Sequence, residues 1–255
     1  MTAPAPRGEQ LCGVITGAAS GIGRACVDLF LARGARIDAW DRSADALKSL
    51  ESLGAGAGAA IATRVVDVTD PESVTSASHA VHEQWGRVDF VVNCAGAFLV
   101  GPLSEVPADS VRGLFDVNVL GTTLVTQALL PGLTASRGSI VNVASAVALK
   151  ATPSNSHYAA SKAAVAHLTR CWALELGPQG VRVNCVAPGP TATPIYRAAG
   201  MTVEQEDALL RERASTIPLR RIGDPVDTAR WITTLALEDN WTTGAVVPID
   251  GGMSL

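Results

Sequence analysis

The amino-acid sequence predicts an α/β fold in which a doubly wound, seven-stranded parallel sheet is covered by helices on both faces. Two observations lead to this prediction. Short apolar runs rich in β-branched residues alternate with longer helical patterns from one end of the chain to the other. These runs are apolar at almost every position, which is typical of parallel strands buried on both faces. The alternation therefore favours a layered α/β sandwich.

The predicted elements follow one another in order along the chain. Strands are expected at residues 11–16, 35–40, 61–66, 88–93, 139–144, 181–186 and 245–250. Helices are expected at residues 21–33, 43–53 and 71–85, the last with proline at its first position. Residues 54–60, GAGAGAA, follow a helix and precede a strand, so we interpret them as a flexible connector and not as a phosphate loop. Because composition changes nowhere along the chain, residues 11–255 are predicted to be one domain.

Composition limits the possible partners. The 255 residues are 47% hydrophobic and 17% charged, with a net charge of −4. Because there is no basic cluster, neither nucleic acid nor an anionic membrane is an expected partner. The uncharged run at residues 117–136 is long enough to span a bilayer, but Asn118, Gln127 and Pro131 favour a helix buried in protein.

The first ten residues and the cysteines indicate the cellular compartment in which the protein is expected. Residues 1–10 are predicted to be a flexible tail, without the apolar stretch of a secretory signal. The five cysteines are odd in number and widely spaced, which indicates reduced thiols in a cytoplasmic protein. His79 and His82 could share a helix face, but no further ligands complete a set, so no metal site is predicted.

A glycine-rich turn follows the first predicted strand, in the segment VITGAASGIGRA at residues 14–25. Gly17, Gly21 and Gly23 leave room for a dinucleotide backbone, and a helix starting near Gly21 points its free N–H groups at a pyrophosphate. Ile22 lies in the same turn, and Ser20 either caps the helix or bonds a phosphate. The spacing differs from the common G-x-G-x-x-G, so a plain strand-to-helix turn is the alternative.

Acidic residues end the second and third predicted strands. Asp41 lies where a carboxylate can accept hydrogen bonds from the adenosine ribose and repel a 2′-phosphate. NAD is therefore the expected cofactor, although the neighbouring Arg42 would suit NADP. Asp67 is placed to meet the adenine edge, or alternatively to cap the helix that begins at Pro71.

Tyr158 and Lys162 stand four positions apart in NSHYAASKAAV, residues 155–165. On a helix they would be neighbours on one face. An ammonium beside a phenol favours the phenolate and lowers the phenol pKa toward the range where a proton-transfer group works best. The pair is therefore a candidate acid/base, and the alternative is an exposed helix that happens to carry both residues.

These segments together resemble the short-chain dehydrogenase/reductase family over nearly the whole chain. The matching motifs are TGAASGIG (16–23), DV (67–68), NCAG (93–96), Asn118, Ser145, YAASK (158–162), PGPTAT (188–193) and DGG (250–252). Cys94 and Ala144 replace a frequent asparagine and a frequent serine, and neither position carries chemistry. The resemblance implies a Rossmann fold and an enzyme that transfers hydride between a nicotinamide cofactor and an alcohol or ketone.

The resemblance also implies roles for individual residues. Tyr158 would exchange the substrate proton, and Lys162 would lower its pKa and hold the nicotinamide ribose. Ser145 would bond the substrate oxygen, and Asn118 would interrupt its helix and hold a water of a proton relay. Besides these residues and those of the glycine turn, the implied cofactor contacts are Val68, Asn93, Ala95, Gly96, Pro188, Gly189, Thr191 and Thr193.

The resemblance further implies a lid over the substrate at residues 190–219 and a homotetramer. The pocket walls are expected to be mainly apolar, which favours a cyclic or branched alcohol of modest size; they are Phe98, Ala146, Val147, Leu149, Pro190, Ile195 and Tyr196. His157 and Arg197 either contact polar groups of the substrate or lie at the surface.

Three functions remain open. The first is an NAD-dependent dehydrogenase of secondary alcohols, which Asp41 favours. The second is an NADPH-dependent reductase of ketones or 3-oxoacyl groups. The third is a non-catalytic NAD-binding sensor or scaffold, which the complete set of Asn118, Ser145, Tyr158 and Lys162 disfavours.

Overall fold

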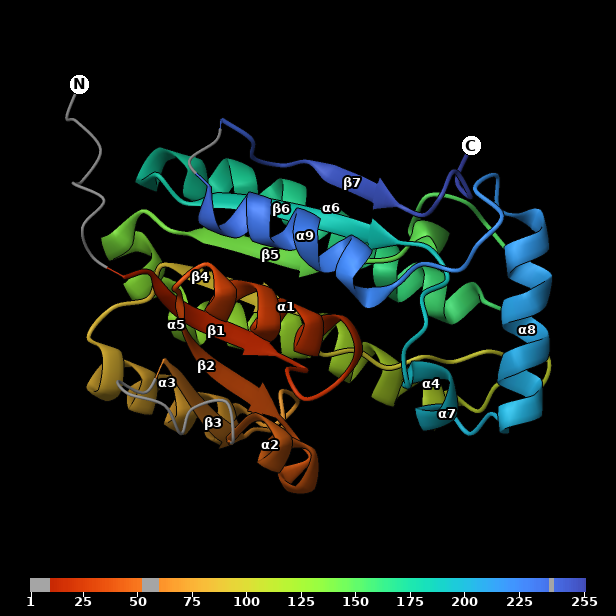
Figure 1. Ribbon diagram of the computed structural model, residues 1–255, viewed down its shortest axis with the longest axis horizontal. Coiled ribbons are helices and arrows are strands. Elements are labelled where there is room, and N and C mark those ends of the chain that lie inside the picture. The colour runs from red at the N-terminus through yellow and green to blue at the C-terminus, as the bar shows by residue number, and fades with distance from the viewer. Residues whose placement is uncertain (1–9, 52–59, 239–240) are drawn as a thin grey trace.

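The computed structural model describes residues 10–51, 60–238 and 241–255, and these form one seven-stranded parallel sheet between two layers of helices (Figure 1). The strand order is β3-β2-β1-β4-β5-β6-β7. The strands are β1 (Cys12–Thr16), β2 (Arg36–Asp41), β3 (Ile61–Val65), β4 (Phe90–Asn93), β5 (Ser139–Val143), β6 (Arg182–Pro188) and β7 (Val246–Ile249). The predicted doubly wound Rossmann fold is therefore confirmed.

Burial follows strand position in the sheet. β1, β4 and β5 are buried at every residue, as continuous apolar runs of a parallel sheet require. The edge strands β3 and β7 are only partly buried, and Val65 at the end of β3 is 61% exposed. The expectation of burial on both faces therefore holds for the centre of the sheet and not for its edges, where one neighbour is missing.

Helices connect the strands. They are α1 (Gly21–Ala32), α2 (Ala44–Glu51), α3 (Pro71–Trp85), α4 (Ala108–Phe115), α5 (Thr122–Ser136), α6 (Ser156–Leu176), α7 (Ile195–Ala198), α8 (Val203–Thr216) and α9 (Pro225–Leu237). Three shorter turns of helix are η1 (Asp116–Gly121), η2 (Ala146–Ala148) and η3 (Gly177–Gln179). Of the predicted connector at residues 54–60, all but Ala60 lies outside the described residues, as does the predicted tail apart from Gln10.

Each face of the sheet has its own apolar core. On one face α1, α2 and α9 pack through residues such as Phe30, Leu50 and Ile232, with Phe30 stacked at a tilt on Phe90. On the other face α3, α5 and α6 pack through residues such as Leu129 and Leu176 (Figure 1). The helices that follow the neighbouring strands β1 and β4, α1 and α5, therefore lie on opposite faces, and open α/β sheets form a ligand crevice at such a point.

The long apolar stretch before β5 is an interrupted helix. By length and composition Ala108–Ser136 could cross a membrane, which is a weak indication because core helices of soluble proteins meet the same criterion. Val125, Leu129 and Leu133 of α5 are fully buried against the sheet. The predicted burial of this helix in protein is thus confirmed for its inner face.

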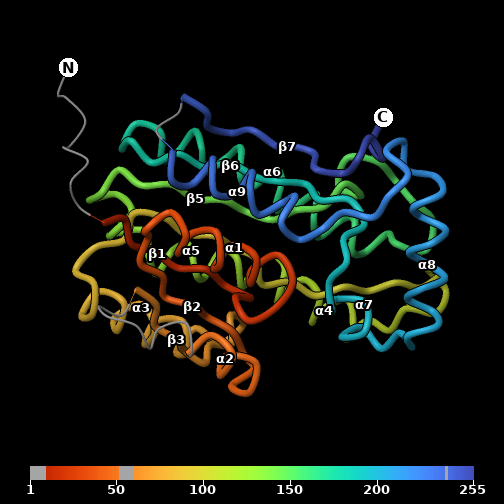
Figure 2. Tube along the Cα trace, in the orientation of Figure 1, coloured from red at the N-terminus to blue at the C-terminus, as the bar shows by residue number. Residues whose placement is uncertain are grey.

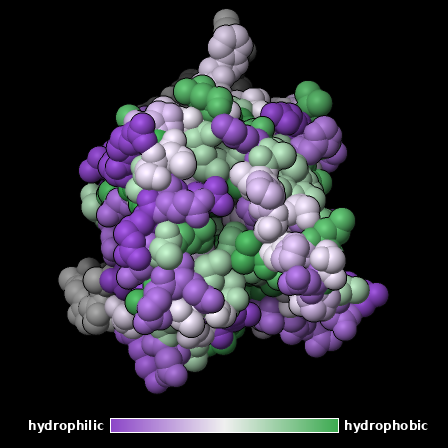
Figure 3. Space-filling view, turned by 90° about the vertical axis from the view of Figure 1, so that its right-hand side faces the viewer, coloured by the Kyte–Doolittle hydropathy of each residue, from purple (hydrophilic) through white to green (hydrophobic). Residues whose placement is uncertain are grey.

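The carboxyl ends of all seven strands lie at the same end of the molecule, because the sheet is parallel. Helices α7 and α8 stand there, beyond the two helical layers (Figure 2). Viewed from this end, hydrophobic residues lie in a hollow between hydrophilic ones (Figure 3). Residues 190–219, where a lid is expected, contain α7 and α8 and lie at the carboxyl-terminal end of the sheet.

Candidate active site

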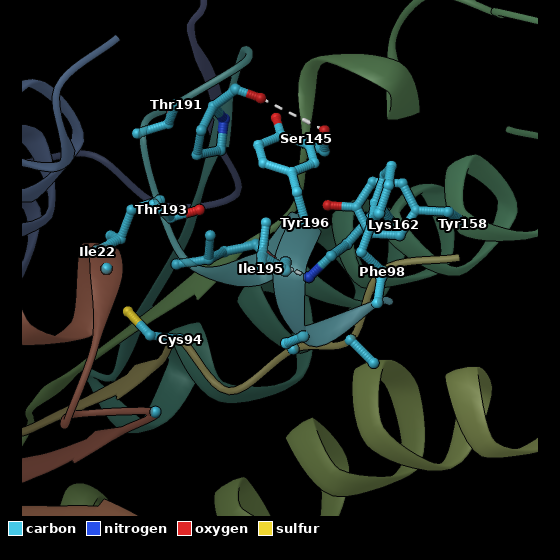
Figure 4. Close-up of a pocket in the computed structure, with 18 of the residues that line it drawn as sticks. Ile22, Cys94, Phe98, Ser145, Tyr158, Lys162, Thr191, Thr193, Ile195 and Tyr196 are labelled. Carbon is cyan, nitrogen blue, oxygen red and sulfur yellow. Dashed lines mark hydrogen bonds between the residues drawn. The ribbon is translucent and has the colours of Figure 1, made fainter. Parts of the chain in front are cut away.

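One crevice at the carboxyl ends of the strands brings together most of the residues predicted from the sequence (Figure 4). It is bounded by the ends of β1, β2, β4, β5 and β6 and by α7 and α8. The predicted residues that line it are Gly17, Ser20, Gly21, Ile22, Gly23, Asp41, Asp67, Val68, Ala95, Gly96, Ser145, Tyr158, Lys162, Pro188, Gly189, Thr191 and Thr193.

The glycine turn between β1 and α1 fits a dinucleotide. Gly17 has a φ of 61°, and a Cβ there would lie 3.0 Å from the Cα of Ala95, so this position requires glycine. Ser20 is the N-cap residue of α1, but its side chain makes no capping hydrogen bond, and the first turn carries no acidic residue. The N-terminus of α1 therefore keeps donor groups for an anion, as a pyrophosphate requires.

Two carboxylates, Asp41 and Asp67, line the crevice beside the ends of β2 and β3. Asp41 accepts hydrogen bonds from the backbone N–H of Ala19 (3.1 Å) and of Ser43 (3.0 Å), so it orders the glycine turn as well as lining the crevice. Asp67 accepts from the N–H and the hydroxyl of Thr69, and these bonds lower the pKa of Asp67. The cap of α3 is Asp70, so the alternative capping role of Asp67 is wrong.

Tyr158 and Lys162 lie on α6 inside the crevice, with 8% and 5% of their surface exposed. The Lys162 ammonium lies 5.9 Å from the centroid of the Tyr158 ring and donates a hydrogen bond of 2.9 Å to the carbonyl oxygen of Val143 at the end of β5. Ser145 follows two residues later, and its hydroxyl is 3.4 Å from the carbonyl oxygen of Pro188. The alternative of an exposed helix carrying both residues is therefore wrong.

Burial controls the protonation of this pair. It raises the pKa of the Tyr158 phenol, and the Ser145 hydroxyl only partly offsets the effect. Burial also lowers the pKa of Lys162 to about 8. The pKa of Tyr158 in the polypeptide alone is therefore raised and not lowered as expected, because desolvation is the largest effect on it.

Asn118 interrupts its helix, as predicted, in the π-helical turn η1. Its side-chain oxygen accepts from the N–H of Ala97 (2.8 Å), while its amide donates to the carbonyl of Ala97 (3.1 Å) and to the hydroxyl of Ser161 (3.0 Å). Ser161 in turn donates to the carbonyl of Tyr158. Asn118 thereby joins the loop after β4 to the turn of α6 that separates Tyr158 from Lys162.

The predicted contact of Asn93 with the cofactor is corrected by the structure. Asn93 is 4% exposed and is not part of the crevice wall. Its amide donates to the Thr126 hydroxyl and to the Asn142 side-chain oxygen, and Asn142 donates to the Thr169 hydroxyl. Asn93 and Asn142 are register partners on β4 and β5. The sequence signal for this buried network was an asparagine in each of two otherwise apolar strands, at positions that pair in the sheet.

At the substrate end of the crevice the prediction for Leu149 is wrong, since it is 43% exposed and lies outside the crevice wall. His157 and Arg197 also lie outside the wall, so the alternative of contact with the substrate is not supported for them. Wall residues that no motif indicated come from the loop after β4, from the segment before α6, from residues 190–219 and from the end of the chain; they include Ala97, Val100, Thr152, Asn155, Met201, Leu209, Arg213 and Met253. Only the folded chain shows which residues of α7 and α8 face inward.

A glycine turn suited to pyrophosphate, next to a buried phenol, a buried amine and a half-buried serine hydroxyl, defines a nicotinamide-dependent oxidoreductase. A family model described as enoyl-(acyl carrier protein) reductase matches residues 17–254. The chain belongs to the short-chain dehydrogenase/reductase family.

Relatives and solved structures resemble the chain over its length. It is 38% identical to a 3-oxoacyl-[acyl-carrier-protein] reductase of Thermotoga maritima, covering 94% of this chain and 96% of the relative. The crystal structure of a levodione reductase superposes with a TM-score of 0.89 at 30% identity, covering 96% and 97% of the two chains. A structure of ElxO with NADP bound gives a TM-score of 0.87 at 29% identity, covering 96% and 99%.

The role of the close approach of Gly17 to Ala95 can be tested by comparing Gly17→Ala with a control variant, Gly34→Ala. Gly34 has a similar φ of 77° but no atom within 4 Å of an added Cβ, and it lies in the turn before β2, away from the crevice. We expect Gly34→Ala to lower the free energy of unfolding by about 1–2 kcal/mol and to leave cofactor binding unchanged. Gly17→Ala should in addition raise the dissociation constant for NADH at least about tenfold in fluorescence titrations. Equal dissociation constants for both variants would contradict the role of the turn.

Titration of Lys162 should make the free energy of unfolding depend on pH. Its pKa is about 8 in the folded protein against an ordinary value of 10.5, so the buried ammonium destabilises the fold below pH 8 and this effect fades as the pH rises to 10.5. Across this range the wild type should gain stability relative to Lys162→Met by at most about 1.4 kcal/mol per pH unit in denaturant titrations. A stability difference independent of pH would show that the ammonium is not desolvated.

Proposed function

We propose that the protein is an NAD-dependent dehydrogenase of secondary alcohols with Tyr158 as its acid/base. The observation that carries this proposal is the meeting of Tyr158, Lys162 and Ser145 in the crevice that the glycine turn also lines. When bound, nicotinamide supplies the hydride acceptor and, in its oxidised form, a positive charge.

Four side chains of the protein supply the proton transfer, the hydrogen bond to the substrate, the nearby positive charge and the positioning. Tyr158 takes the hydroxyl proton of an alcohol, or gives one to a ketone, through its phenolic oxygen. Ser145 donates a hydrogen bond to the substrate oxygen, a contribution of about 3–4 kcal/mol for comparable donors. Lys162, held by the Val143 carbonyl, keeps a positive charge beside the phenol at neutral pH. Asn118 fixes the turn of α6 that carries both.

The choice of NAD over NADP rests on Asp41. Its carboxylate lines the crevice at the end of β2 and would repel a 2′-phosphate. Arg42 lines the crevice beside it and supports the alternative, an NADPH-dependent reductase of ketones or 3-oxoacyl groups. The similarity to a 3-oxoacyl reductase and to a protein with NADP bound also favours that alternative.

The substrate pocket supports an apolar alcohol of modest size, cyclic or branched. Phe98 stacks edge-on against Tyr158 and against Tyr196, with ring centroids 4.9 and 5.3 Å apart. Ala146, Val147, Pro190 and Ile195 complete this wall. We propose that α7 and α8 act as a lid that excludes water from it.

We further propose that the enzyme is a cytoplasmic homotetramer. Exposed apolar side chains on the outer faces of neighbouring elements support association, among them Leu120 of η1 (45% exposed) and Leu174 of α6 (81%). Sedimentation of the purified protein measures the number of subunits directly.

Tyr158→Phe separates an enzyme from a non-catalytic NAD-binding scaffold. The variant loses the proton-transfer group but keeps the ring packed on Phe98, so we expect kcat to fall about 10²–10⁴-fold with cofactor affinity retained. Tyr196→Phe removes a second crevice phenol and should cost far less. Turnover by Tyr158→Phe at the wild-type rate would remove the assigned acid/base.

Asp41→Asn tests the cofactor. The amide keeps one oxygen for the N–H of Ala19, loses the acceptor for the N–H of Ser43 and removes the charge, so the preference for NAD in kcat/KM should fall about tenfold or more. The comparison uses steady-state rates with NAD and with NADP for both proteins. If the wild type uses NADP as well as NAD or better, the NADPH-dependent alternative replaces the proposal.

A further inference from the structure

The lid helix α8 directs one face toward the crevice. Glu206, Leu209 and Arg213 recur at helical spacing on this face. Glu206 is 6% exposed and is paired with Arg197 at 2.7 Å, so its charge is neutralised within the lid. Leu209 and Arg213 line the crevice itself.

The Arg213 guanidinium has no counterion in the described part of the chain. Its side chain forms neither a hydrogen bond nor an ion pair with residues 10–51, 60–238 or 241–255, although it is half-buried. Burial is the largest effect on the pKa of the Tyr196 phenol and raises it, while the Arg213 charge lowers that pKa and the Glu206 charge raises it. A half-buried guanidinium at an apolar wall suits a planar anion that accepts two hydrogen bonds.

Aromatic rings connect the reacting group to the lid. Phe98 contacts both Tyr158 and Tyr196, with ring centroids 4.9 and 5.3 Å apart (Figure 4). Tyr196, Leu209 and Arg213 all line the crevice from the lid segment. A substrate whose alcohol carbon meets Tyr158 would therefore lay an apolar part along these rings before a second group reached Arg213.

The other charged residues that line the crevice lie away from its substrate end or are bonded to the backbone. Asp41, Arg42 and Asp67 follow β2 and β3 at the adenosine side, and Lys162 is bonded to Val143. Among the described wall residues, Arg213 is thus the charged group at the substrate end. We propose that the substrate is a hydroxy acid or oxo acid whose carboxylate pairs with Arg213, across an apolar segment from the carbon that reacts at Tyr158. This inference rests on the proposed function and specifies its substrate class.

Acid and ester forms of the same alcohols test the inference. Hydroxyhexanoates and hydroxycyclohexanecarboxylates with a secondary hydroxyl are assayed as free carboxylates and as methyl esters, with wild type, Arg213→Met, Arg213→Lys and the control Arg211→Met. Arg211 is exposed on the same helix, so its variant makes the same change of charge outside the crevice. The wild type should prefer the carboxylates at least about tenfold in kcat/KM.

Arg213→Met should abolish this preference, chiefly through KM for the carboxylates, and change kcat/KM for the esters far less. Arg213→Lys should recover part of it, Arg211→Met should retain it, and added salt should raise KM for the carboxylates alone. Equal use of acid and ester by the wild type would overturn the inference and leave the dehydrogenase intact. A loss in Arg213→Met that is equal for acid and ester would also overturn it, because the residue would then be merely structural.

Failure of the dehydrogenase itself has a different signature, namely no turnover of any alcohol or corresponding ketone with NAD(H) or NADP(H). In that case calorimetric binding of the same carboxylates and esters decides the inference independently. Binding selective for the carboxylates that Arg213→Met removes would support it. Binding without such selectivity, or no binding, would overturn it.

Discussion

The active site depends on the burial of two titratable side chains whose charged forms are both disfavoured by desolvation. Tyr158 and Lys162 lie in the crevice with less than a tenth of their surface exposed. Burial raises the pKa of the phenol and lowers that of the amine to about 8. The polypeptide therefore holds a neutral phenol beside an amine close to its titration point, and a positive charge brought next to the phenol shifts the balance toward phenolate.

The surrounding structure supports this pair through backbone groups and buried amides. The end of β5 supplies the Val143 carbonyl that holds Lys162, and Ser145 follows on the same strand connection. The π-helical turn η1 gives Asn118 three side-chain hydrogen bonds that join the loop after β4 to α6. Beneath them, Asn93 and Asn142 bond across adjacent strands. These buried contacts fix the relative positions of β4, β5 and α6, on which the geometry of the site depends.

The sequence predicted the sheet, the glycine turn and the reacting side chains because each has a local signal, such as the apolar runs of the strands or the spacing of Tyr158 and Lys162. It failed at Asn93, because motif matching assigns a residue to a site without showing where its side chain points. It also failed for the Tyr158 pKa, because desolvation depends on packing that spacing does not reveal. No sequence signal indicated Arg213, since only the folded chain shows which face of α8 meets the crevice.

Ultraviolet titration of the Tyr158 phenol tests the central claim most directly. The chain contains two tyrosines, so subtracting the curve of Tyr158→Phe from that of the wild type isolates this residue. The account predicts that Tyr158 in the protein alone ionises above the ordinary value of 10, and that adding oxidised dinucleotide moves its titration to lower pH. Ionisation at or below 10 without dinucleotide would contradict it, because Lys162 would then outweigh burial.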